Sequence, residues 1–127
     1  MVDAANEKHT GIGRAVAGNL LKPLNPAYDS ASYLRPRSME QRLALELLMD
    51  PTVSLVSLIG QAGTGKTLLA LAAGMANSLK SGRYEKLLVS RPVIPLGRDI
   101  GYLPGTKDEK MKLWMQPIFD NLAYLMG

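Results

Sequence analysis

A phosphate-binding pattern, G-x-x-x-x-G-K-[ST], is matched in full by Gly60, Gln61, Ala62, Gly63, Thr64, Gly65, Lys66 and Thr67. Glycines at these places let the backbone approach a ligand and turn its N–H groups inward as an anion-binding nest. Lys66 is expected to reach the β- and γ-phosphates, and the Thr67 hydroxyl to ligate Mg²⁺, so these two residues would act in any catalysis. The alternative is a glycine-rich turn from a strand into a helix, with an exposed lysine.

Two polar residues outside the pattern are candidates for the same site. Gln41 precedes the loop, and its amide offers a donor and an acceptor side by side, which suits the edge of adenine. The alternative is that Gln41 only completes a helix-capping box with Ser38. Arg91 ends an apolar run, where it would hold a phosphate of RNA or of the nucleotide. Its alternative is a surface arginine at the end of a strand.

Other charged and aromatic residues are weaker candidates. Arg98 lies in the following loop, and the segment Arg35-Pro36-Arg37 is more typical of a solvated turn than of a nucleic-acid contact. Trp114, Phe119 and Tyr124 have helical spacing in a Leu/Met-rich segment, which favours core positions over base stacking.

Local signals predict the helices. A helix begins after Ser38, which is followed three residues later by Gln41, and it ends at Asp50 before Pro51. Residues 67–79 are almost all Leu and Ala, and Ser81-Gly82 closes this second helix. A third helix is expected from Thr106 or Asp108 to Met126, either kinked or divided by Pro117.

Two apolar segments rich in β-branched residues are predicted to form buried strands of a parallel sheet, at 53–59 and 86–90. Strand, helix and strand in this order predict a right-handed βαβ unit. The fold class is therefore α/β, a P-loop NTPase type with a parallel sheet and flanking helices. Residues 1–33, rich in Gly and Pro, are expected to form an irregular arm ahead of a domain at 34–127, and residues 92–106 a long structured loop.

Composition excludes several classes of protein. The 127 residues include no cysteine, so disulfides, thiolate catalysis and Cys-ligated zinc are excluded. No apolar run approaches the about 18 residues of a membrane span, and residues 1–14 lack a signal-peptide segment, which favours the cytoplasm. The net charge of +4 arises in residues 51–127, a mild bias that suits a nucleotide or RNA, or reflects scattered lysines.

An acidic residue at the end of another strand normally holds Mg²⁺ and orients water in such enzymes. None of the acidic residues after Thr67 follows a strand-like apolar run. Only two strands are predicted, whereas sheets of this kind have about four to six. We therefore expect the first half of an ATPase domain.

The chain resembles the PhoH family of P-loop ATPases, related to superfamily 1 helicases, over residues 34–126. The resemblance rests on Gln41, residues 60–67, Ser90-Arg91-Pro92, Gly101-Tyr102-Leu103-Pro104-Gly105, Glu109-Lys110 and Pro117-Ile118-Phe119-Asp120-Asn121. It is strongest to PhoH modules that follow a PIN-type ribonuclease domain, although residues 1–33 are too short to be one.

The resemblance implies ATP binding with Mg²⁺, Gln41 on the adenine side, and hydrolysis coupled to RNA unwinding or turnover. It also implies a ring-shaped homo-oligomer as one assembly. The family's acidic strand motif and later arginine motifs are absent from these 127 residues. Turnover by this chain therefore stays open, and the alternatives are a non-catalytic nucleotide-binding or assembly module and a small-molecule P-loop kinase.

Overall fold

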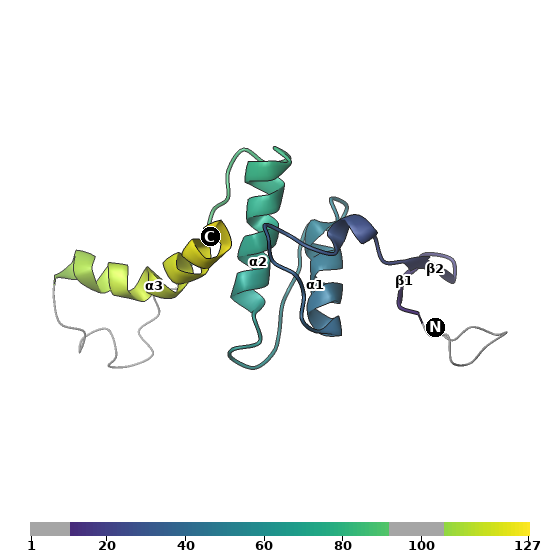
Figure 1. Ribbon diagram of the computed structural model, residues 1–127, viewed down its shortest axis with the longest axis horizontal. Helices are drawn as coiled ribbons and strands as arrows, with labels where there is room; N and C mark the ends of the chain where they lie inside the picture. The colour runs from purple at the N-terminus through teal and green to yellow at the C-terminus, as the bar shows by residue number, and fades with distance from the viewer. Residues whose placement is uncertain (1–10, 92–105) are drawn as a thin grey trace.

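The computed structural model describes residues 11–91 and 106–127. Their elements, in chain order, are β1 (Gly13–Val16), β2 (Leu20–Pro23), the 3-10 turn η1 (Pro26–Tyr28), α1 (Met39–Met49), α2 (Lys66–Met75), the π-helical turn η2 (Ala76–Lys80) and α3 (Lys107–Met126). Figure 1 shows α2 between α1 and α3, with the β1–β2 hairpin at the end of the molecule away from α3.

The first and third helices begin where their capping residues predict. The Ser38 hydroxyl accepts a hydrogen bond from the Gln41 N–H at 3.2 Å, and α1 ends before Asp50, which has an extended backbone. Thr106 and Glu109 form a reciprocal capping box at the start of α3. Pro117 lies inside α3, which stays one helix, so the expectation of two separate helices is wrong.

The helix predicted at 67–79 is confirmed, but its last turn is π-helical. The Ser81 N–H bonds to the Ala76 carbonyl at 3.0 Å, five residues back, and the Ser81 hydroxyl donates to the Asn77 carbonyl at 2.9 Å. Gly82 then takes a left-handed conformation with φ +62°, which ends the helical path.

The core forms around α2, because this helix is rich in Leu and Ala and packs against α1 and α3. Burying a leucine stabilises the fold by about 1.5–3 kcal/mol, and Leu45 of α1 is fully buried against this cluster. The buried apolar residues are Ala31, Leu45, Leu69, Leu71, Ala72, Ala73, Met75, Ala76, Ile118 and Leu125. Phe119 and Tyr124 are 51% and 64% exposed, so their predicted place in the core is wrong.

The two predicted strands, 53–59 and 86–90, form no β-ladder within the described residues. Their predicted burial is also wrong, since Leu55, Ile59 and Leu88 are 85%, 96% and 88% exposed. A strand needs a neighbour for its backbone groups. No ladder joins these two segments to each other, and they line separate cavities beside α2. The fold remains α/β in the broad sense, but the one ladder of the described residues is antiparallel, so the predicted parallel sheet is wrong for them.

That ladder lies in the predicted irregular arm, so the prediction is wrong for residues 13–23. β1 and β2 pair with Gly13 opposite Pro23 and Val16 opposite Leu20. The turn between them contains Gly18 at φ +77° and Asn19 at φ +59°. These are the residue types that adopt left-handed turns in hairpins.

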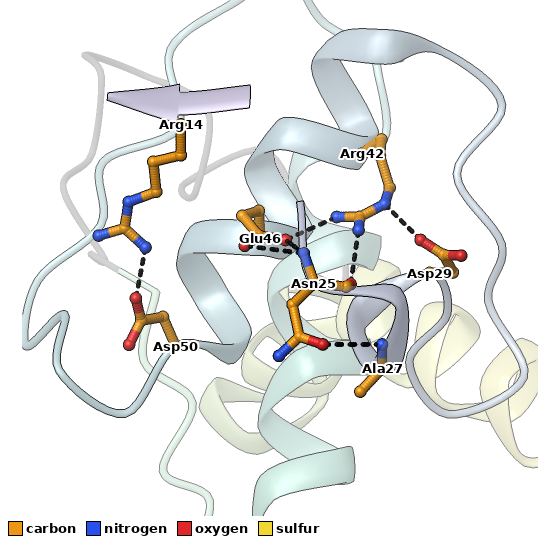
Figure 2. A network of polar contacts seen from close by, with 7 residues as sticks. All are labelled: Arg14, Asn25, Ala27, Asp29, Arg42, Glu46 and Asp50. Atoms are coloured by element: carbon orange, nitrogen blue, oxygen red, sulfur yellow. Dashed lines mark hydrogen bonds and ion pairs between the residues drawn. The ribbon is translucent and has the colours of Figure 1, made fainter. Parts of the chain in front are cut away.

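A polar cluster fastens the chain after the hairpin to α1 (Figure 2). The buried Glu46 carboxylate accepts the Asn25 N–H at 3.0 and 3.2 Å and Arg42 Nη1 at 3.0 Å. Arg42 also donates to Asp29 at 2.7 Å and to the Asn25 carbonyl at 2.7 Å. The Asn25 side chain in turn accepts the Ala27 N–H at 3.0 Å and caps η1. We call Asn25, Asp29, Arg42 and Glu46 the arm clasp.

A second tie joins the hairpin to the end of α1. Arg14 pairs with Asp50, as Figure 2 shows. The pKa of Asp50 is lowered from 3.8 to about 2, because the Thr52 hydroxyl and N–H donate to the carboxylate and Arg14 lies beside it. The carboxylate therefore stays charged at every pH at which the fold is normally studied.

Candidate phosphate-binding site

The loop 60–67 has the backbone that its glycines predict. Gly63 and Gly65 lie in the left-handed region, at φ +78° and +84°, and Gly65 is the N-cap of α2. The N–H groups of the first turn of α2 have no partner within the helix and carry its positive dipole end. A helix that starts on a glycine loop in this way is a general anion site.

Lys66 lies within the loop that would hold the phosphates. Its ammonium donates to the Gly60 carbonyl at 2.8 Å, to the Gln61 carbonyl and to the Thr64 hydroxyl at 3.2 Å. The Thr64 hydroxyl itself donates to the Gln61 carbonyl at 2.8 Å. The three N–H donors of the ammonium thus meet three neutral oxygens, and no carboxylate of the described residues pairs with Lys66.

Thr67 follows Lys66 in the first turn of α2. Its side chain is exposed and lines a cavity of about 550 Å³, and its hydroxyl makes no hydrogen bond within the described residues. A hydroxyl oxygen is a ligand that Mg²⁺ accepts, with water and phosphate oxygens as the others. No group of three or more His, Asp or Glu residues lies together in the part of the chain that the structure describes.

Gln41 reaches the loop through its amide, and both ends of that amide are engaged. Its Oε1 accepts the Arg37 N–H at 2.7 Å, and its Nε2 donates to the Thr64 carbonyl at 3.1 Å. The capping box is therefore only half formed, because Ser38 receives the Gln41 N–H while the Gln41 side chain goes elsewhere. Reading of adenine by Gln41 stays a prediction.

Arg91 lies on the same cavity as Thr67 but is held against α3. Its Nη1 donates to the Trp114 carbonyl at 2.9 Å, and its guanidinium is 4.5 Å from the centre of the Trp114 ring. Contact of Arg91 with a phosphate would require it to leave this position, and it stays a prediction. Arg98 and the motif 101–105 lie outside the described residues.

Sequence reasoning missed two cations beside the loop. Arg35 and Arg37 line a cavity of about 440 Å³ together with Gln41, Gly63 and Gly65. The interpretation as a solvated turn overlooked this proximity. The available signal was their position just before Gln41, on the segment that enters the helix nearest the loop.

Comparison with known proteins gives a consistent result. The family model described as "PhoH-like protein" matches residues 33–127. A protein of Bacillus subtilis, "Protein PhoH2", is 51% identical over the whole of this chain, which spans 29% of that protein. "Protein PhoH2" of Mycolicibacterium smegmatis is 52% identical over 72% of this chain and 21% of its own length.

A more distant relative, "PhoH-like protein" of Mycobacterium leprae, is 34% identical over 73% of this chain and 26% of its own length. The chain thus spans less than a third of the length of these relatives. No solved structure matches it. Among the helices of the described residues, none has the length and apolarity that crossing a membrane requires.

Proposed function

Because this chain belongs to the PhoH family of P-loop ATPases, we propose that it binds ATP as its Mg²⁺ complex through residues 60–67. The observation that carries the proposal is the position of the Lys66 ammonium inside a glycine loop at the N-terminus of α2. A polyanion entering there meets backbone N–H groups, a helix dipole and a cation.

Each group has a defined part in this proposal. The N–H groups of the loop donate hydrogen bonds to phosphate oxygens, and the Lys66 ammonium leaves the carbonyls of Gly60 and Gln61 to bind the β- and γ-phosphates. The Thr67 hydroxyl takes one ligand position of the metal. Mg²⁺ supplies neutralisation of the charge that the two outer phosphates share.

The chain covers 29% of the length of its Bacillus relative. We therefore propose hydrolysis coupled to RNA unwinding or turnover as an activity of the whole protein and not of these 127 residues alone. Nucleotide binding without turnover is the second candidate. It is favoured by the scarcity of acidic residues that could orient a water, since Glu40 is the one acidic residue among the described residues that line the three cavities next to the loop. The pKa of Glu40 is lowered by its own backbone N–H and by Ser38, which ties this carboxylate to the start of α1.

Isothermal titration of MgATP into the chain tests the proposal. Lys66→Ala should weaken binding about 10- to 100-fold, the range for removing a charged hydrogen-bonding group. The matched control is Lys112→Ala, an exposed lysine of α3, which should bind as the parent does. Equal affinity of the parent and Lys66→Ala would refute the assignment. Phosphate release, measured with and without single-stranded RNA, separates turnover from binding alone.

A further inference from the structure

We propose that Gln41 is a positioning residue for the phosphate loop, holding the Thr64–Gly65 peptide so that the Gly65 N–H faces a bound phosphate. The inference rests on the proposed function and assigns Gln41 a role other than the reading of adenine. Its basis is the hydrogen bond of 3.1 Å from Gln41 Nε2 to the Thr64 carbonyl, which joins α1 to the loop across 23 residues of sequence.

The geometry of the peptide bond turns this contact into control of a donor. In a trans peptide, the C=O and the following N–H point in opposite directions. Because the Thr64 carbonyl points to Gln41, the Gly65 N–H points away from Gln41. A rotation of this one peptide would reverse both groups and present a carbonyl to the ligand in place of a donor.

Close packing at Gly65 supports the same role. A Cβ built on Gly65 would lie 3.2 Å from Gln41 Nε2, so the amide rests directly against the backbone of the loop. Gly65 also has φ +84°, which a residue with a side chain rarely adopts. The Gln41 amide thus occupies the space that the missing side chain leaves.

The other end of the amide explains why it keeps this orientation. Gln41 Oε1 accepts the Arg37 N–H at 2.7 Å. If the amide turned over, Nε2 would face the Arg37 N–H and Oε1 would face the Thr64 carbonyl, so both hydrogen bonds would be lost. The Arg37 N–H therefore selects the orientation of the Gln41 amide.

The experiment compares MgATP with magnesium tripolyphosphate, which has phosphates but no base. Gln41→Met keeps the length of the side chain and removes both hydrogen bonds, whereas Gln41→Glu keeps the acceptor for Arg37 and loses the donor to Thr64. Each variant should weaken the binding of both ligands by the same factor. This factor is about 2- to 10-fold for Gln41→Met, which loses neutral hydrogen bonds, and larger for Gln41→Glu, whose carboxylate also repels the phosphates. The matched control, Gln116→Met, changes an exposed glutamine of α3 and should bind like the parent.

Two binding results would overturn the inference. Weaker binding of ATP with unchanged binding of tripolyphosphate would make Gln41 a reader of the base, and unchanged binding of both would leave it no role in the loop. Circular dichroism of each variant checks that the helices are retained.

A measurement without ligand keeps the inference testable if the proposed function fails. Amide hydrogen exchange and chemical shifts of Gly63 and Gly65 should change in Gln41→Met and Gln41→Glu but not in Gln116→Met. Unchanged loop amides in both Gln41 variants would refute the positioning role, whether or not the parent binds ATP. Absence of ATP binding by the parent would refute only the proposed function.

Discussion

Replacing Glu46 by alanine should release the arm from α1 and lower the free energy of unfolding. The side chain of Glu46 is 8% exposed, and that of its partner Arg42 is 14% exposed. The carboxylate accepts hydrogen bonds from the Asn25 N–H and from Arg42. Its removal leaves that N–H without its acceptor and the guanidinium with one carboxylate fewer.

The expected loss is about 2–3 kcal/mol. A hydrogen bond to a charged group contributes about 1.5–3 kcal/mol, and removal of one member of a buried ion pair costs about 3–5 kcal/mol. The lower part of this range applies because Arg42 keeps the Asp29 carboxylate and the Asn25 carbonyl. Asp29→Ala is the matched control: it removes a carboxylate whose side chain is 68% exposed, which should cost about 0–1 kcal/mol.

Urea unfolding followed by far-UV circular dichroism at neutral pH measures the free energy of unfolding of both variants. The value for Glu46→Gln should fall between theirs, because glutamine keeps an acceptor for the Asn25 N–H. Tryptic cleavage after Arg14, in the hairpin, gives an independent measure, since a released arm is cut faster. Equal destabilisation by Glu46→Ala and Asp29→Ala, within about 0.5 kcal/mol, would show that burial of the arm clasp has no energetic importance.

Three further predictions follow from single contacts. Because the pKa of Asp50 falls from 3.8 unfolded to about 2 folded, the hydrogen bonds that its carboxylate accepts from Thr52, together with its pair with Arg14, should stabilise the fold above about pH 4, and this stabilisation should be lost as pH falls toward 2. Acid titration of the parent against Asp50→Asn should show a smaller acid-induced loss in the variant. Gly65→Ala should disturb the loop and weaken the binding of MgATP, because the new Cβ would lie 3.2 Å from Gln41 Nε2 and the residue would have to keep φ +84°. Titration calorimetry of this variant against the parent checks the prediction. Ile59→Thr should change the unfolding free energy by less than about 0.5 kcal/mol, since the side chain is 96% exposed, whereas a loss above about 1 kcal/mol would place it in a core.

The helices could be predicted from sequence because their signals are local. Ser38 and Thr106 satisfy N–H groups three residues away, so the sequence window that forms each cap also contains its evidence. The phosphate loop is equally local, since the left-handed glycines and Lys66 lie within seven residues of one another.

The strands could not be predicted in the same way, because pairing depends on a neighbour that may be anywhere in a polypeptide. Apolar β-branched residues at 53–59 indicate a preference for an extended backbone but identify no partner, and the described residues place none beside them. The contact of Gln41 with the loop could not be predicted for a related reason. The capping pattern lies within the residues around Gln41, whereas its side-chain donor meets a carbonyl 23 residues away.

The contact of Arg91 with Trp114 gives the protein an intrinsic fluorescent reporter. Trp114 is the one tryptophan in the sequence, and the guanidinium lies 4.5 Å from the centre of its ring. Any event that draws residues 87–91 away from α3 removes a cation from the face of the indole, and emission from that single fluorophore should shift. Because Thr67 and Arg91 line the same cavity, a ligand that draws Arg91 into that cavity could be followed through Trp114 without a dye.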